Sequence, residues 1–389
     1  MKNKALKIKL IVLVSILLAI ITLLLLKSNE WIAEYIFARG FSRAWIYVIG
    51  HITSIFHFSI FELLVITAII LGIIYIVRLI KRLFKKQWKV VGNSLIGLSI
   101  IVLSIFLVYT ATATMNYNRY PVDIELYSDE VTNEEILAMG SYYLNDFNAI
   151  SERLNRDENG NIISPYTNIE LADLMREEFR RLEYSKYFNS YVPLAKPMIL
   201  SKALSYNYLL GISFLPTGEP NINGDAPCFE LPYTMAHEMA HSLGVMRENE
   251  ADLVATYITL TSENDFIRYS GYLNTFYGYL YSVALSGNIE EYYLLSGSMN
   301  PLIDNDYNFI SEYWLSYSSL FANISNFFND LYLKFQGEED GTDSYNNDDD
   351  TEIIDTGEID DEGHIIYEII YSETQQLYFE LYFNNIITD

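Results

Sequence analysis

The stretch 237–252, HEMAHSLGVMRENEAD, decides the expected fold of the second half of the chain. His237 and His241 are four residues apart, so on a helix their imidazoles lie on one face and can bind one metal ion. Glu238 points about 100° away from His237 on such a helix, outside the ligand set but within reach of a zinc-bound water. Zinc hydrolysis needs this division, because the ligands hold the ion while a free carboxylate takes the proton of its water. The spacing predicts a Zn²⁺ site with His237 and His241 as ligands and Glu238 as general base.

A catalytic zinc needs a third protein ligand, and two candidates follow the motif. Gly244 is the expected end of the motif helix, and a second helix would return Glu248 or Glu250 to the ion. These two glutamates point about 200° apart on a helix, so only one of them can face the metal. We favour Glu248 and keep Glu250 as the alternative. Asp252, four residues after Glu248, is placed to accept a hydrogen bond from the second nitrogen of a histidine ligand.

Three apolar runs in the first 113 residues indicate a membrane anchor. With their flanks they predict transmembrane helices at about residues 8–26, 57–79 and 93–111. Each reaches about 20 residues, enough to cross about 30 Å of hydrocarbon as a helix. The sequence KSNEWIAEYIF follows the first run in place of a small-residue cleavage site, so we expect an uncleaved anchor. Residues 31–58 are aromatic and partly apolar, and they are expected to lie along the outer membrane surface.

The lysines and arginines predict the orientation of this anchor. Four lysines precede the first apolar run, and residues 78–89 after the second run read RLIKRLFKKQWK. The positive-inside rule places both segments in the cytoplasm. Three crossings then put the chain after about residue 113 outside the cytoplasmic membrane.

Residues 114–336 are expected to form an α+β domain of the zincin-like metallopeptidase type. The residues TNEE at 132–135 are a capping-box pattern ahead of one amphipathic helix, and a second such helix begins near residue 168. The short apolar stretch 211–215 predicts a strand that leads into a turn-rich loop. Residues 337–363 contain 13 acids and no base, which predicts disorder. The apolar and aromatic segment 364–389 is expected to pack back onto the domain.

Charge is divided unevenly along the chain. Thirteen of the 25 basic residues precede Val90, and only three of the 50 acidic residues precede Thr114. The part expected outside the membrane therefore has 12 basic residues against 47 acidic ones. Such a domain lacks the cations that replace the counterions of a phosphate backbone, which excludes nucleic acid as a partner.

The segments around the motif are similar to those of a known group of proteins. They read GISFLPTGEPNIN at 211–223, LPYTMAHEMAHSLG at 231–244 and ENEAD at 248–252. Over about residues 205–258, and in its three N-terminal spans, the chain resembles a bacterial family of uncharacterised membrane-anchored HExxH proteins in the gluzincin-type zinc peptidase set. The resemblance implies a peptidase-like fold and leaves the substrate open. In gluzincin-type enzymes the first glutamate of E-x-x-x-D is a ligand, which supports Glu248 as the ligand and Asp252 as its companion.

The same resemblance gives the strand before the motif a role. In zinc peptidases of this type that strand often runs along the cleft and pairs with the substrate backbone. The candidate substrate-binding residues are Ile212, Phe214, Pro216, Glu219, Asn221 and Asn223. The last three lie in the expected loop and are either substrate contacts or structural residues.

The leading hypothesis is a membrane-anchored zinc peptidase that hydrolyses amide bonds outside the cytoplasmic membrane. Its substrate would be a peptide or protein, with components of the cell envelope among the candidates. The alternative is a non-catalytic surface scaffold on the same anchor, with a structural or vestigial zinc site. An open coordination position beside Glu238 distinguishes the two, because only the enzyme requires it.

Overall fold

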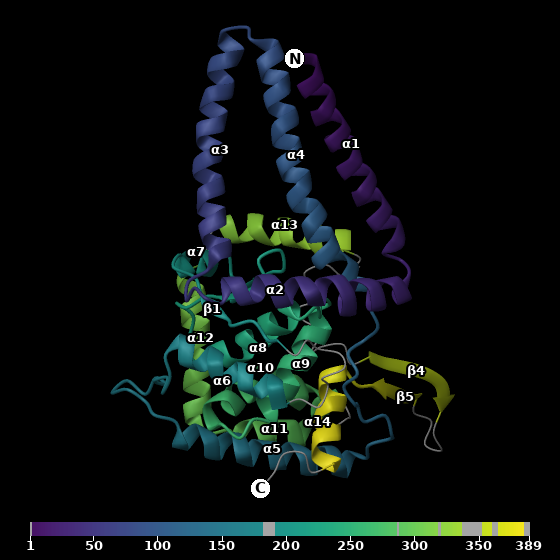
Figure 1. Ribbon diagram of the computed structural model, residues 1–389. Helices are drawn as coiled ribbons and strands as arrows, with labels where there is room; N and C mark the ends of the chain where they lie inside the picture. Colours follow the sequence, from purple (N-terminus) through teal and green to yellow (C-terminus); the bar gives the residue numbers. More distant parts are fainter. Residues whose placement is uncertain are drawn as a thin grey trace.

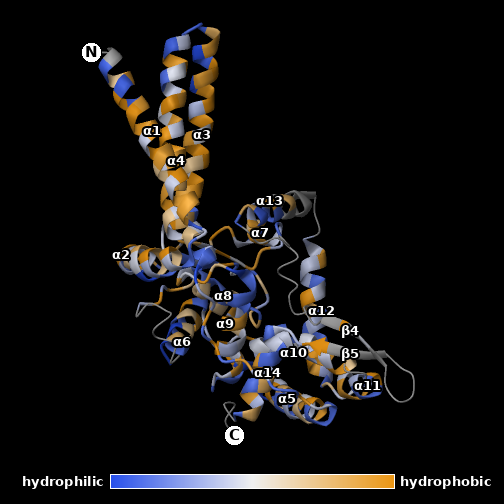
Figure 2. Ribbon diagram, turned by 90° about the vertical axis from the view of Figure 1, so that its right-hand side faces the viewer, coloured by the Kyte–Doolittle hydropathy of each residue, from blue (hydrophilic) through white to orange (hydrophobic). Residues whose placement is uncertain are grey.

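The computed structural model describes residues 2–181, 191–285, 288–317, 320–336, 352–359 and 365–384. Three long helices stand on a mostly helical domain that contains a small sheet (Figure 1). They are α1 (Lys2–Leu26), α3 (Ile60–Phe84) and α4 (Trp88–Thr112), and each is long and apolar enough to cross a membrane. Most of their residues are hydrophobic (Figure 2), and many of the large apolar ones are exposed, as expected of helices that face lipid.

These helices differ from the predicted spans mainly at their ends. Ser59 caps α3, because its Oγ accepts a hydrogen bond from the backbone N–H of Glu62 at 2.9 Å. This cap sets the start of α3 at Ile60, a few residues later than expected. At its other end α3 continues through a basic stretch to Phe84. Lysine, arginine and leucine are strong helix formers, so the helix extends beyond the end of the apolar run.

A continuous helical segment crosses the foot of the spans between α1 and α3. It consists of the π-helical η1 (Ile32–Ser42) and α2 (Arg43–Thr53), which lie across the long axes of the spans (Figure 1). Large side chains on its outer side are exposed, including Tyr35, Phe41 and Tyr47. An aromatic, exposed face at the end of apolar spans is typical of a helix that lies along a membrane surface.

The domain beyond residue 113 is mainly helical. Apart from the two helices of the candidate site, its helices are η2 (Thr114–Asn118), α5 (Asn133–Arg153), α6 (Asn168–Arg181), α7 (Ser201–Ser205), α10 (Asp265–Leu285), α11 (Ile289–Gly297), α12 (Pro301–Ser316), α13 (Leu320–Gln336) and α14 (Glu373–Phe383). The capping box predicted at the start of α5 is confirmed, with Thr132 and Glu135 bonded to each other's backbone.

Tyrosine fills much of the core between α5, α10 and α14. Tyr143, Tyr279 and Tyr378 are fully buried. The Tyr279 hydroxyl donates to the Ile136 carbonyl at 2.7 Å, and the Tyr143 hydroxyl donates to the Tyr378 carbonyl at 2.5 Å. Each phenol thus keeps a hydrogen-bond partner while its ring is removed from water, so the rings contribute their apolar area without an unsatisfied hydroxyl.

A three-stranded sheet lies beside the candidate site in the order β1–β3–β2. Its strands are β1 (Lys196–Pro197), β2 (Gly211–Phe214) and β3 (Glu219–Ile222). β1 runs parallel to β3, and β2 runs antiparallel to it with Gly211 opposite Ile222. The strand predicted at 211–215 is therefore present and lies at an edge of the sheet. The prediction of a loop after it was wrong for residues 219–222, because pairing on both sides holds them as β3.

The C-terminal region contains a hairpin and a docked helix. The hairpin strands are β4 (Glu352–Ile359) and β5 (Ile365–Ile370), paired antiparallel with a register shift near Gly357. Disorder was expected at 337–363, and it does not hold for residues 352–359, where isoleucines between the acids support a strand. The rest of that acidic segment lies outside the described residues. α14 packs against α9 and α10, with Leu377 and Tyr378 fully buried.

Buried polar contacts join the anchor to the domain. Glu62, in the first turn of α3, accepts hydrogen bonds from the backbone N–H groups of Ile199 and Leu200 at 2.8 and 2.7 Å. Arg119, just after η2, pairs with Glu34 of η1 at 3.0 Å, and both side chains are buried. Burial acts to raise the pKa of Glu34, but the neighbouring arginines outweigh it and lower that pKa. Breaking a buried pair of this kind is costly, so these contacts hold the domain firmly to the spans.

Candidate metal centre

Two helices joined by a tight turn bring the motif residues together. α8 (Leu231–Ser242) has Pro232 in its first turn, and Gly244 follows its last turn with a φ of +94°. That conformation favours glycine, and a Cβ at this position would also lie 3.1 Å from Nδ2 of Asn116. The chain then reverses into α9 (Glu248–Leu260), which packs against α8.

His237, His241 and Glu248 converge at one point. The Oε2 atom of Glu248 lies 3.2 Å from Nε2 of His237 and 3.2 Å from Nε2 of His241. One ligand atom from each of the three residues lies within 4.8 Å of the others, a spacing suited to one ion. Two imidazoles and one carboxylate are the donor set of many catalytic zinc sites, so the residues present fit Zn²⁺.

The two histidines are held by their other ring nitrogens. Nδ1 of His237 donates to Oδ1 of Asp252 at 2.7 Å, and Nδ1 of His241 donates to the Val245 carbonyl at 2.7 Å. These partners hold a proton at Nδ1 of each ring, so Nε2 is the nitrogen that faces Glu248 and would bind a metal ion after losing its own proton. Asp252 therefore lies beside a histidine of the site, as the sequence analysis expected. The Val245 carbonyl orients the other histidine, and the sequence analysis did not identify it. Such partners are typical of histidines that bind metal.

The charges of the three residues depend on one another. Burial acts to raise the pKa of Glu248, but the two histidines outweigh it and lower the pKa to about 2. Burial acts to lower the pKa of His237, but Asp252 and Glu248 outweigh it and raise that pKa well above its ordinary value. The pKa of His241 is raised by Glu248 in the same way, against the effect of burial. A buried carboxylate that needs a cation beside it can take a divalent ion in place of imidazolium protons.

Glu238 lies beside this trio and faces β2. Its side chain is buried, and within the described part of the chain no hydrogen bond reaches its Oε2 atom. Gly211 of β2 lies directly against it, since a Cβ there would come within 2.5 Å of both Cγ and Oε1 of Glu238. Burial raises the pKa of Glu238, and the two histidines only partly offset the rise. A carboxyl group with one unbonded oxygen and a raised pKa is suited to accept a proton.

Glu250, the alternative third ligand, points elsewhere. Its Oε1 atom pairs with Nη2 of Arg247 at 2.7 Å and accepts a hydrogen bond from the backbone N–H of Val122 at 3.2 Å. The structure therefore brings Glu248 to the histidines and directs Glu250 toward the segment after η2.

Glu219, a candidate for substrate binding, joins the sheet to a span. Its carboxylate oxygens accept hydrogen bonds from the backbone N–H groups of Ile60 and Phe61, each at 2.9 Å. Its Oε1 atom also pairs with Nζ of Lys196 at 2.7 Å, and both side chains are only 1 % exposed. Glu219 thus caps the N-terminus of α3 and has a structural role there.

Asn221 and Asn223 are also structural residues of the sheet. Both are fully buried. Nδ2 of Asn221 donates to the Ile212 carbonyl at 3.1 Å, and Nδ2 of Asn223 donates to Oγ of Ser205 at 2.9 Å. Of the two roles that the sequence left open for these loop residues, the structure supports the structural one.

Ile212, Phe214 and Pro216 lie on or just after β2 and are partly buried. β2 pairs with β3 along one side, and among the described strands none pairs with its other side. The Oγ of Ser213 donates to the Glu238 carbonyl at 2.6 Å, so β2 passes directly along α8. The Phe214 ring contacts Phe61 of α3, with centroids 4.7 Å apart.

Three tyrosines that the sequence analysis did not identify interact electrostatically with Glu248. They are Tyr109 of α4, Tyr117 of η2 and Tyr332 of α13, and the Tyr332 hydroxyl bonds to both of the others. Burial raises the pKa of Tyr332, and the charge of Glu248 adds to the rise. The Tyr332 phenol therefore stays protonated near the trio. No local pattern links these tyrosines to the motif, because three separate elements supply them.

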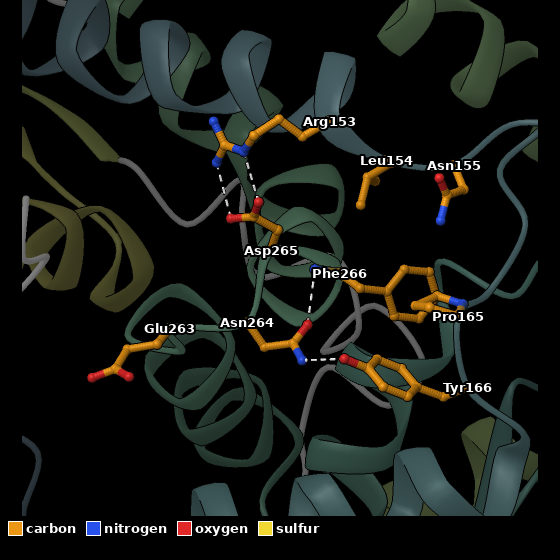
Figure 3. Close-up of a pocket in the computed structure, with 9 residues that line it drawn as sticks. All are labelled: Arg153, Leu154, Asn155, Pro165, Tyr166, Glu263, Asn264, Asp265 and Phe266. Carbon is orange, nitrogen blue, oxygen red and sulfur yellow. Dashed lines mark hydrogen bonds and ion pairs between the residues drawn. The ribbon is translucent and has the colours of Figure 1, made fainter.

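A separate cavity of about 340 Å³ lies between the end of α5 and the start of α10 (Figure 3). It contains none of the trio's residues. Arg153 forms a two-point ion pair with Asp265 at 2.7 and 2.9 Å, and Asn264 donates to the Tyr166 hydroxyl at 2.7 Å. Because these polar groups bond to one another, we assign the cavity no catalytic role.

Comparison with protein families matches most of the chain to a family of unknown function. The family described as "Protein of unknown function (DUF3810)" matches residues 37–348, which include the second and third apolar helices, the sheet and the candidate metal centre. No curated protein and no solved structure matches the chain.

Proposed function

We propose that this chain, which belongs to the DUF3810 family, is a membrane-anchored zinc peptidase. The observation that carries the proposal is the convergence of His237, His241 and Glu248, with both imidazoles oriented through Nδ1. The free Oε2 atom of the buried Glu238 beside them supports a hydrolytic role. A purely structural site would not need an unbonded carboxylate oxygen there.

In this proposal His237, His241 and Glu248 hold Zn²⁺. When bound, zinc supplies Lewis-acid chemistry, because it lowers the pKa of water and polarises a carbonyl group. Glu238 accepts the proton of the attacking water at Oε2 and later delivers it to the leaving amine. Its raised pKa suits both steps, since the same carboxyl must gain and then lose a proton.

The edge of β2 that no described strand covers is the proposed binding surface for substrate. An extended polypeptide can add to an unpaired strand edge by backbone hydrogen bonds. Gly211 lies against Glu238, so a chain added along β2 passes beside the general base. Ile212, Phe214 and Pro216 would then contact substrate side chains, while Glu219, Asn221 and Asn223 hold the sheet.

The proposed location of the reaction is outside the cytoplasmic membrane. The basic N-terminus and the basic segment at 78–89 favour the cytoplasm. The three spans then carry the domain to the other side, where cell-envelope peptides and proteins are the accessible substrates.

A comparison of membrane and envelope peptides from cells with wild-type or Glu238→Gln protein tests this activity. Glu230→Gln is the matched control, because Glu230 is a second buried carboxyl, next to the first turn of the same helix. We expect substrates to accumulate uncleaved with Glu238→Gln and to be processed normally with Glu230→Gln. Identical peptide profiles for wild type and Glu238→Gln would contradict the proposed reaction.

The scaffold alternative rests on the burial of the trio. The side chains of His237, His241 and Glu248 are 14 %, 9 % and 7 % exposed, as a structural metal site would be. In that case His241→Ala would destabilise the domain, while Glu238→Gln would change neither cleavage nor stability.

A further inference from the structure

α13 has an apolar side that faces away from the protein. Leu331 and Phe335, one turn apart, are 57 % and 59 % exposed, and Phe327 one turn earlier is exposed as well. Leu333, about 200° round the helix from Leu331, is fully buried, and Tyr332 lies at the flank between the two sides and is partly buried. A helix on a water-facing surface has the reverse pattern, with polar residues outward.

The C-terminal end of α13 is bonded to the ends of two spans. The Gln336 carbonyl accepts a hydrogen bond from Nζ of Lys27, the residue after the end of α1. Nε2 of Gln336 donates to Oγ1 of Thr114 at 3.3 Å, just beyond the end of α4. Leu25 is exposed, so the apolar surface of α1 continues almost to this level. α13 therefore lies where the apolar surface of the spans ends.

The direction of α13 fits a position along a membrane surface. Figure 1 shows it lying across the long axes of the spans, level with the domain-side ends of α3 and α4 and slightly nearer the spans than α2. Figure 2 shows α2 and α13 on opposite sides of the foot of the spans. Both helices expose large apolar side chains. Helices of this kind lie in the plane of a membrane surface with their apolar faces in contact with lipid.

We propose that α13 rests on the membrane surface, with Leu331 and Phe335 in contact with lipid. The continuity of this face with the apolar surface of the spans favours lipid over a second protein. Tyr332, on the flank of the same helix, bonds to Tyr109 and interacts electrostatically with Glu248. α13 is thus a layer between the bilayer and the candidate metal centre. This contact requires neither a bound metal nor catalysis.

Spin labels on the full-length protein in phosphatidylcholine proteoliposomes test the contact. Cys228 is the single cysteine, so Cys228→Ala provides the background for Leu331→Cys. The matched control is Leu294→Cys on α11, because Leu294 is 69 % exposed and α11 lies at the end of the domain far from the spans (Figure 1). The measurement is the ratio of label collisions with dissolved oxygen, which concentrates in lipid, to collisions with a water-soluble nickel chelate.

We expect this ratio to be several-fold higher at Leu331 than at Leu294. Equal, water-like ratios at the two positions would overturn the proposal, because α13 would then face solvent. Low collision rates with both reagents at Leu331 would also overturn it, because a second protein surface would then cover the helix. Phe335→Cys reads the same face one turn away and decides the question if Leu331→Cys does not fold.

Discussion

The buried pair of Lys196 and Glu219 leads to a quantitative prediction about the attachment of the sheet to the spans. Nζ of Lys196 lies 2.7 Å from Oε1 of Glu219 and donates to the Thr53 carbonyl at 2.6 Å, and both charged side chains are 1 % exposed. Lys196→Met removes the cation and leaves a buried carboxylate at the N-terminus of α3. Losing one partner of a buried pair costs about 3–5 kcal/mol.

The local structure reduces this cost. Glu219 still accepts hydrogen bonds from the N–H groups of Ile60 and Phe61. The helix dipole of α3 also stabilises the unpaired carboxylate by about 0.5–1 kcal/mol. We therefore expect Lys196→Met to lower the free energy of unfolding by about 3 kcal/mol. At about 3 °C per kcal/mol for a domain of this size, the melting temperature falls by about 10 °C.

Thermal unfolding of the full-length protein in detergent measures this loss. Arg153→Met is the matched control, because Arg153 and Asp265 form an ion pair with side chains 49 % and 34 % exposed. Exposed pairs contribute about 0–1 kcal/mol. The double variant Lys196→Met with Glu219→Gln should lose less than the sum of the two single changes, because no unpaired charge remains. If Lys196→Met were as mild as Arg153→Met, the buried pair would not join the sheet to α3 as described.

Three further predictions concern the candidate site and its helix. Gly211→Ala should lower the rate of hydrolysis with little effect on zinc content, because the new Cβ displaces the Glu238 carboxylate; unchanged turnover on a substrate found in the peptide comparison would count against this contact. Burial raises the pKa of Glu230 to about 8, so between pH 4.5 and pH 8 this carboxyl stays protonated in the folded protein while it ionises in the unfolded chain, and stability falls as pH rises. Each pH unit in that window costs about 1.4 kcal/mol, so Glu230→Gln should raise the melting temperature at pH 8 and leave it nearly unchanged at pH 4.5; an equal effect at both pH values would contradict the raised pKa. Glu248→Gln should lower zinc affinity strongly and Glu250→Gln only weakly, as measured by competition with a chelator, and the reverse order would assign the third ligand to Glu250.

Local patterns were enough to predict the elements around the motif. The four-residue spacing of His237 and His241, a glycine that ends one helix and a glutamate that begins the next are all short-range features. The structure places these residues together because α8 and α9 are joined by a tight turn. The three spans were predictable for a similar reason, since length and hydropathy alone distinguish them.

The contacts between distant elements could not be predicted in this way. Glu219 was left between a substrate role and a structural one, because nothing near it in the sequence shows that it caps α3. β3 contains Pro220 and follows turn residues, so its local pattern indicates a loop, and only its two neighbouring strands make it part of a sheet. Tyr332 reaches the surroundings of Glu248 from α13, a helix far along the chain. Such contacts depend on the tertiary fold, which a single sequence does not show.

Zinc content is the most direct test of the central claim that His237, His241 and Glu248 form a metal centre. The measurement is the metal content of purified full-length protein by inductively coupled plasma mass spectrometry, with His241→Ala as the ligand variant. Leu294→Cys is the control for zinc lost or gained during purification. Leu294 is exposed on α11 and is not one of the three candidate ligands His237, His241 and Glu248. We predict one zinc per chain in the wild type and in the control, and far less in His241→Ala. A wild-type protein without stoichiometric zinc, or a His241→Ala variant that retains it, would contradict the account.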